Sequence, residues 1–266
     1  MKTTRLISMK EAVTLVKPGD TLALGGVMLY RRPVGFVYEL LRQTQPPTDL
    51  TILSFTAGYE ADLLIGAGCA SRTRTCYFGL EAFGFAPMFT QAANQGKLQI
   101  IEETEASLAL GMRAQMAGVG FMPSTAWLGT DLLKLRPDVK TVVDPYNGQE
   151  VVAFPAISAD VAVLHARAAD RRGNVRLNNN LGIDPELAVI GKEVIVTAEE
   201  IVDSLSSDIA ISGALITAVV AAPRGAWPTS CYPDYPMAGG EIMRYVEACA
   251  NGQFDDYLQQ VAAKKA

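Results

Sequence analysis

Short apolar runs alternate along this chain with segments of helical spacing, and turn-forming residues separate them. Residues 21–24 and 50–54 are compact apolar or β-branched runs, which predicts two buried strands. Residues 8–16 begin with a serine suited to a helix N-cap, and a second helix is expected to start near Pro33 and to end before the breaker at 46–47. This alternation predicts an α/β fold, in which an open, mostly parallel sheet is flanked by helices.

The same pattern predicts further elements along the chain. Between residues 123 and 150, prolines and glycines interrupt the rhythm, which predicts a less regular excursion from the sheet. We expect residues 1–266 to form a single domain, and we find no internal repeat. The further strands are expected at 75–78, 98–101, 151–154, 161–164, 194–197 and 218–221, and the further helices at 60–65, 106–116, 240–250 and 254–263.

Composition narrows the classes of partner. The net charge is -5, and the chain has no block of basic residues that would neutralise a nucleic acid backbone, so we expect no nucleic acid partner. The first residues mix apolar and charged side chains, so we expect neither a signal peptide nor a membrane anchor and favour a cytoplasmic location.

The cysteines and the one histidine are expected to be structural. The four cysteines are scattered without a CxxC pair, so no metal site is predicted and the thiols are expected to be idle. His165 follows the apolar run 161–164, which is typical of a buried imidazole whose hydrogen bonds are satisfied. A single buried histidine also argues against a Ser-His-Asp mechanism.

The Gly25–Gly26 turn is the most informative passage, because it joins the end of a strand to the start of a helix, where α/β proteins place their ligands. Free backbone N–H groups at such a turn favour an anion. Arg31 and Arg32 lie beside the helix start, where each cation opposes the macrodipole by about 0.3–1 kcal/mol. A substrate anion between the arginines and the turn would explain them; the alternative is that they face solvent or pair with Glu39 and Asp62.

Three other passages are candidates for the same site. Glu105 follows the strand at 98–101 and opens a helix, so it is a candidate general base, although an acid that complements the helix dipole is the simpler explanation. Two turn-rich loops are candidates to offer backbone amides to a thioester carbonyl or a carboxylate. Their candidate residues are Thr56, Ala57 and Gly58 in one loop and Gly129 and Thr130 in the other. The loop at 223–232 is expected to serve packing or a subunit contact.

Several stretches taken together resemble a known family over nearly the whole chain. They include Gly-Asp-Thr-Leu-Ala-Leu-Gly-Gly at 19–26, Gly-Thr-Asp at 129–131, and further matches at 39–43, 62–68, 160–166, 173–175, 223–228 and 231–232. This set resembles the α subunits of family I coenzyme A transferases, most closely those of the glutaconate CoA-transferase type. The resemblance implies a second, related β subunit in an assembly of α₂β₂ type. It also implies an acyl-CoA and a carboxylic acid as substrates, with no bound cofactor.

In such enzymes, the resemblance implies, the β subunit's glutamate attacks the acyl-CoA. It usually lies in a Ser-Glu-Asn-Gly motif, which this chain lacks. The α subunit would then bind the acid with the turn, the two arginines and the loops. Two alternatives stay open. Glu105 stands where transferases tend to have a neutral polar residue, which resembles relatives that hydrolyse or decarboxylate CoA thioesters with this acid as base. The other is a non-catalytic anion-binding α/β module.

Overall fold

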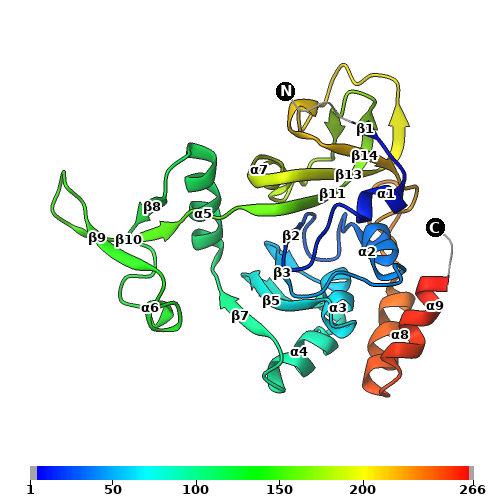
Figure 1. The fold of residues 1–266 in the computed structure, drawn as a ribbon, viewed down its shortest axis with the longest axis horizontal. Coiled ribbons are helices and arrows are strands. Elements are labelled where there is room, and N and C mark those ends of the chain that lie inside the picture. Colours follow the sequence, from blue (N-terminus) through cyan, green and yellow to red (C-terminus); the bar gives the residue numbers. More distant parts are fainter. Residues whose placement is uncertain (1–4, 264–266) are drawn as a thin grey trace.

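A nine-stranded sheet forms the centre of the molecule in the computed structural model, which describes residues 5–263 (Figure 1). Neighbouring strands along its main path are parallel, and β12 (Val175–Arg176) pairs antiparallel with β11. This confirms the predicted open, mostly parallel sheet. The order along the path is β1 (Arg5–Leu6), β14 (Ala218–Ala221), β13 (Gly191–Val202), β11 (Ala159–Asp170), β2 (Thr21–Leu24), β3 (Leu50–Leu53), β5 (Ala70–Thr75) and β7 (Gln99–Glu102).

Alternate residues of the central strands bury into two different cores. Leu22 and Leu24 of β2 pack into one cluster, whereas Ala23 points into the other, as the two-residue period of a strand requires. The first core is covered by α1 (Met9–Val13), α2 (Val34–Leu41), α3 (Tyr59–Gly66), α4 (Pro87–Asn94), α8 (Gly239–Ala250) and α9 (Phe254–Ala263). The second core is covered by α5 (Glu105–Ala117) and α7 (Asp184–Ile190). Separately, two short 3₁₀ turns lie in loops at Glu81–Phe83 and Gly213–Leu215.

The segment after α5 leaves the sheet and forms an arm, as the sequence predicts (Figure 1). The arm contains α6 (Leu132–Leu135) and an antiparallel sheet of β8 (Phe121–Ser124), β10 (Glu150–Pro155) and β9 (Lys140–Val143). A small apolar cluster around Trp127 and Phe154 holds it together. The arm is therefore a separate layer that follows the end of α5 and contacts its start.

Most predicted elements lie where the pattern places them, but the strand predicted at 75–78 is wrong. The chain there forms β5, which ends at Thr75, and the separate β6 (Tyr77–Phe78), which pairs with β4 (Thr56–Ala57). Arginines alternate along β5, so it lacks the apolar run that the prediction required. β11 and β13 are also longer than predicted, because charged residues occupy their second halves.

The described helices are all too short or too polar to cross a membrane. Residues 1–4, on which the expectation of no leader partly rested, lie outside the described residues.

Candidate active site

The carboxyl ends of the parallel strands bring the predicted site residues to one edge of the sheet. The Gly25–Gly26 turn follows β2, Thr56 follows β3, and Glu105 follows β7. Because β2, β3, β5 and β7 are consecutive neighbours, these positions lie along a single edge, where α/β folds bind ligands.

Both glycines of the turn are required by close contacts. Gly26 has φ +81°, and a Cβ there would lie 2.6 Å from the carbonyl oxygens of Tyr30 and Arg31. A Cβ at Gly25 would lie 2.6 Å from the Asp184 carboxylate. The turn therefore has room for neither side chain, and its backbone must approach both the following residues and α7.

The amides of the turn are already occupied inside the chain. Gly25 donates to the carbonyl of Val163 at 2.9 Å, and Gly26 donates to Asp184 Oδ1 at 2.7 Å. The next two amides donate to Tyr30 and to Thr56 Oγ1. This corrects the expectation that Gly25 and Gly26 offer N–H groups to a substrate: the anion at the turn is the Asp184 carboxylate.

Arg31 completes the same internal site. Its Nη1 lies 2.6 Å from Asp184 Oδ2 and donates to the carbonyl of His165, and both side chains of the ion pair have no exposed surface. The anion that the sequence predicts beside the arginine exists, but the protein supplies it.

Arg32 is buried in the same way. Its guanidinium donates to the Glu60 carboxylate and to the Ser54 hydroxyl, and Arg32 and Glu60 have no exposed surface. Neither alternative partner is correct, since Glu39 pairs with Arg42 and Asp62 accepts the helix-start amides of α4. The expected contact of Arg31 and Arg32 with substrate is thus replaced by two buried ion pairs.

The loop after β3 packs directly on the turn. Met28 donates its N–H to Thr56 Oγ1 at 2.7 Å, and a Cβ at Gly58 would lie 3.2 Å from the Met28 carbonyl. Ala57 is fully buried, so its side chain contributes packing. Met28 has a φ of 53° and an exposed side chain, and it therefore presents an apolar surface at this edge.

Glu105 differs from the other acids at this edge. It is the first residue of α5, after the N-cap Thr104, and its exposed carboxylate makes no hydrogen bond or ion pair with any described residue. Glu103, two positions earlier, is buried between Arg74 and Arg136. Burial, followed by the charge of Glu105, raises the pKa of the nearby Cys76 thiol to about 11.

The arm brings the second predicted loop toward Glu105. The Trp127 indole Nε1 donates to the Thr104 hydroxyl at 2.9 Å, which fixes the Trp127 turn to the start of α5. Gly129 (φ +74°) and Thr130 follow in that turn, where Thr130 donates back to the Trp127 carbonyl, and both are exposed. The predicted residues therefore form two groups: the turn with Thr56–Gly58, and Glu105 with Gly129 and Thr130.

The residues that the sequence did not predict are the internal partners Asp184 and Glu60 and the thiol of Cys76. Asp184 contacts Gly26 across 158 positions. Its one local signal is an acid with a following proline at a helix start, which occurs at many surface helices. Such a signal gives no means of choosing Gly26 as the partner.

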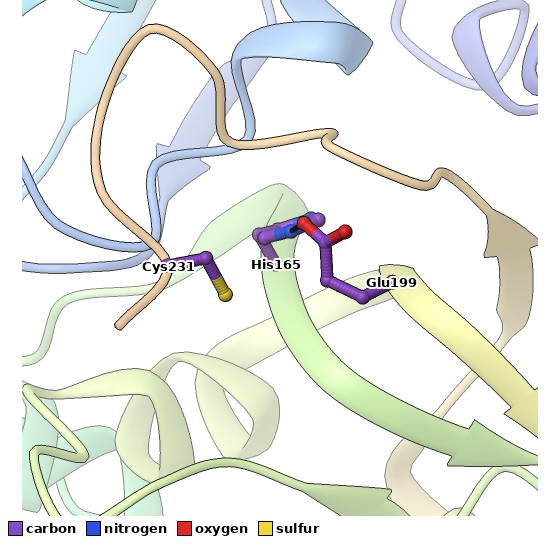
Figure 2. Close-up of side chains that lie close together, drawn as sticks. All are labelled: His165, Glu199 and Cys231. Atoms are coloured by element: carbon purple, nitrogen blue, oxygen red, sulfur yellow. Dashed lines mark hydrogen bonds and ion pairs between the residues drawn. The ribbon is translucent and has the colours of Figure 1, made fainter. Parts of the chain in front are cut away.

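His165 is a buried imidazole with satisfied hydrogen bonds, as predicted. Its Nδ1 lies 2.9 Å from Thr197 Oγ1, and its Nε2 lies 2.7 Å from Glu199 Oε1. Figure 2 shows His165 and Glu199 with Cys231, a group whose donor atoms lie close enough together to be considered for a metal ion. The 2.7 Å between His165 and Glu199 is a hydrogen-bond separation, so in this geometry the two side chains form a structural network. Burial raises the pKa of the neighbouring Cys231 thiol to about 12.

Comparisons with known proteins agree on one family. The family model described as "Coenzyme A transferase" matches residues 6–222. One relative is the A chain of the 3-oxoadipate CoA-transferase of Pseudomonas knackmussii. It is 35% identical over 86% of this chain and 83% of its own length.

Two solved structures are similar over nearly the whole chain. The glutaconate coenzyme A-transferase of Acidaminococcus fermentans superposes with a TM-score of 0.91 at 30% identity, covering 98% of this chain and 90% of the other. A variant of the decarboxylase AibA/AibB superposes with a TM-score of 0.93 at 33% identity, covering 99% of this chain and 100% of the other. The fold therefore matches a transferase and a decarboxylase equally well.

Proposed function

This chain belongs to the coenzyme A transferase family, and we propose that it is the α subunit of a two-chain enzyme that moves CoA between carboxylic acids. In this proposal a glutamate of a separate β subunit is the nucleophile. The similar 3-oxoadipate and glutaconate enzymes are named for dicarboxylic acids, so we propose a dicarboxylic acid or its monothioester as the substrate class.

The hydrogen bonds and ion pairs of the buried glutamates support the part of the proposal that assigns the nucleophile to another chain. A transferase nucleophile must be a carboxylate that reaches the thioester carbon. Glu60 and Glu103 have arginine partners and almost no exposed surface, and Glu199 is held by His165 and Tyr235. None of these three glutamates is available to form a covalent intermediate. Glu105 is exposed, but it does not lie in the Ser-Glu-Asn-Gly motif that usually holds the transferase nucleophile. Together these observations support a nucleophile supplied by another chain.

The role left for this chain is that of the facing wall. Thr56 is 6% exposed and its Oγ1 accepts the Met28 amide; in this proposal its hydroxyl proton is donated to an oxygen of the substrate. The exposed Met28 side chain would contact the acyl chain, and the Gly129–Thr130 turn would close the side beyond Glu105. The buried ion pairs behind the turn keep this wall rigid when the β subunit's glutamate attacks.

A second candidate function is hydrolysis or decarboxylation of a CoA thioester with Glu105 as the base. The position of Glu105 favours this second function, because an exposed acid without a partner can accept a proton. In the transferase proposal this chain only binds the substrate and does not need a base. The similarity to the decarboxylase structure supports it as well.

A trapping experiment tests the first proposal. We would co-express the chain with the β chain of its neighbouring reading frame, incubate the complex with glutaryl-CoA or succinyl-CoA, and treat it with borohydride or hydroxylamine. Peptide mass spectrometry should locate a modified glutamate on the β chain, because the acyl-enzyme and glutamyl-CoA intermediates are trapped by these reagents.

The matched variant is Glu105→Gln, which keeps the size of the side chain and removes its charge. Under the transferase proposal, the variant still forms the adduct and changes turnover by less than about tenfold. Loss of turnover by a factor of about 100 or more, with no adduct in either protein, would instead establish the second candidate.

A further inference from the structure

An apolar pocket lies at the end of the sheet opposite to Glu105. It follows β14, which is next to the last strand at one end of the sheet, whereas Glu105 follows β7 at the other end. The pocket has a volume of about 280 Å³ and is bounded by the loop after β14 and by α1, α2 and α9, which cover the same core (Figure 1). Met9, Tyr38, Ala222, Arg224, Trp227 and Val261 contribute to its lining.

Buried apolar surface forms the floor of the pocket. Tyr38, Ala222 and Val261 are 9%, 7% and 1% exposed. The Tyr38 hydroxyl is already bonded to the Tyr59 hydroxyl at 2.7 Å, so its ring supplies apolar surface. Since one water molecule takes about 30 Å³, the volume of the pocket holds a ligand of roughly nine non-hydrogen atoms. A short alkyl chain or a single aromatic ring therefore fits this floor.

The charge of the pocket differs from that of the whole protein. Among the described residues that line it, Arg42 and Arg224 are cations and none is an acid, although the chain has a net charge of -5. Arg42 is paired with Glu39 at 2.9 Å. The exposed Arg224 guanidinium lies 4.9 Å from the centre of the Tyr235 ring and forms no ion pair within residues 5–263. Arg224 is therefore the group positioned to meet an anion at this pocket.

A tight turn holds the backbone of Arg224. Its φ is 57°, a left-handed conformation that is strained for a residue with a side chain and that occurs often at ligand sites. The N–H of Arg224 donates to the Glu199 carboxylate, and the N–H of Gly225 donates to the Ala222 carbonyl at 2.8 Å. These bonds fix the arginine at the pocket before a ligand arrives, which lowers the entropy cost of binding.

The loop beside the pocket also supports the segment that follows the Gly25–Gly26 turn. Gly35 donates its N–H to the Gly225 carbonyl at 2.7 Å, and Arg31 donates its N–H to the Ser230 carbonyl at 2.7 Å. A ligand that packs on this loop therefore restrains residues 29–35, which include the arginine that pairs with Asp184 behind the turn.

We propose that this pocket is a second binding site, which takes a monocarboxylic acid with a short alkyl chain or a single aromatic ring. The carboxylate lies on Arg224, and the apolar part lies on Tyr38, Ala222 and Val261. The site goes beyond the proposed function, because it lies apart from Thr56 and Glu105 and its occupation does not depend on the reaction. When it is occupied, the acid stabilises the backbone behind the substrate wall.

A charged and a neutral ligand of the same length test the role of Arg224. Calorimetry on the purified complex with its β chain would compare hexanoate with hexanol. Arg224→Gln should weaken hexanoate by about tenfold and leave hexanol unchanged, because the variant removes one charge-assisted contact. Arg224→Lys should keep most of the hexanoate affinity, since the charge remains. Arg171→Gln is the matched control, because Arg171 is exposed, has a weak partner in Asp203 and lies outside the pocket.

A variant that fills the pocket separates this site from the substrate site. Ala221 is exposed and lines the pocket, so Ala221→Leu should occupy its volume and abolish the binding of both ligands there. Hydrogen exchange followed by mass spectrometry supplies a second readout. Saturating hexanoate should slow exchange in residues 29–35 by about twofold or more in the native protein and have no effect in Ala221→Leu. An unchanged melting temperature would show that the variants fold.

Three results would overturn the proposal. The first is equal hexanoate affinity in Arg224→Gln and the native protein. The second is binding that survives Ala221→Leu, which would place hexanoate in the substrate site. The third is binding to the isolated chain that the β chain abolishes, which would assign the pocket to a segment of the partner. The trapping experiment reports on the nucleophile independently, so a trapped glutamate together with any of these results would reject this pocket alone.

Discussion

The Gly25–Gly26 turn and the start of α5 lie on the same edge of the sheet, but charged side chains are buried and paired at the turn and exposed and unpaired at α5. At the turn, Arg31 and Asp184 have no exposed surface and are paired with each other. At the start of α5, Glu105 is exposed and has no partner among the described residues. A charge at a sheet edge is therefore not by itself a sign of a ligand, because only the unpaired charge remains available for chemistry.

The largest effect should come from breaking the buried pair. Asp184→Ala leaves the Arg31 guanidinium buried without its carboxylate and removes the acceptor of the Gly26 amide. We expect a loss of about 3–5 kcal/mol in the free energy of unfolding, measured by urea denaturation. Asp131→Ala breaks an exposed pair with Lys134 and is the control, for which no measurable change is expected. Equal stabilities of the two variants would show that the turn is not held by its internal anion.

A smaller effect is expected from the turn itself. Gly26→Ala forces a side chain into a φ of +81° and against two carbonyl oxygens, which should cost about 2–4 kcal/mol. Gly129→Ala also has a positive φ, but its side chain would meet open space, so about 1–2 kcal/mol is expected from the backbone alone. The difference between their melting temperatures measures the collision. If Gly129→Ala is the more damaging variant, close approach is not the reason for Gly26.

The smallest effect is expected at Glu105, the unpaired acid at the start of α5. Burial and then the charge of Glu105 raise the pKa of Cys76 to about 11, so the thiol is protonated at neutral pH and its alkylation should accelerate with rising pH up to that value. Glu105→Gln removes one of these causes and should speed the reaction of Cys76 with iodoacetamide at about pH 8 by roughly two- to tenfold. Peptide mass spectrometry distinguishes Cys76 from the other cysteines, and Cys69, whose pKa is raised by burial alone, is the internal control. An unchanged alkylation rate at Cys76 in the Glu105→Gln variant would show that the charge of Glu105 does not affect the pKa of the Cys76 thiol.

The sequence was sufficient for the architecture because buried strands and amphipathic helices leave a local pattern. The strand at 21–24 and the helix capped by Ser8 are in the structure where the pattern predicts them. β5 was misplaced because its alternating arginines resemble a polar segment, although Thr73 is buried within it. A search for apolar runs therefore misplaces a strand such as β5, which lies next to the last strand of the sheet and carries alternating arginines.

The site was predicted less completely, for a different physical reason. A glycine turn beside two arginines correctly indicated an anion, but whether that anion belongs to a substrate or to the protein depends on contacts such as Gly26 to Asp184. Such long-range contacts leave no trace in residue spacing. Residue spacing likewise does not show that Arg74 and Arg136 pair with Glu103 and that Glu105, two positions later, is exposed.

The distance in sequence between Arg31 and Asp184 also determines when the turn can form during synthesis. The ribosome makes the turn about 150 residues before it makes α7, so Arg31 of the nascent chain must stay in water until then, whereas Glu60, the partner of Arg32, follows after 28 residues. A domain that folds from its N-terminus cannot bury Arg31 early without uncompensated charge. The first strand and its helix are therefore expected to wait, solvated, for the second half of the protein.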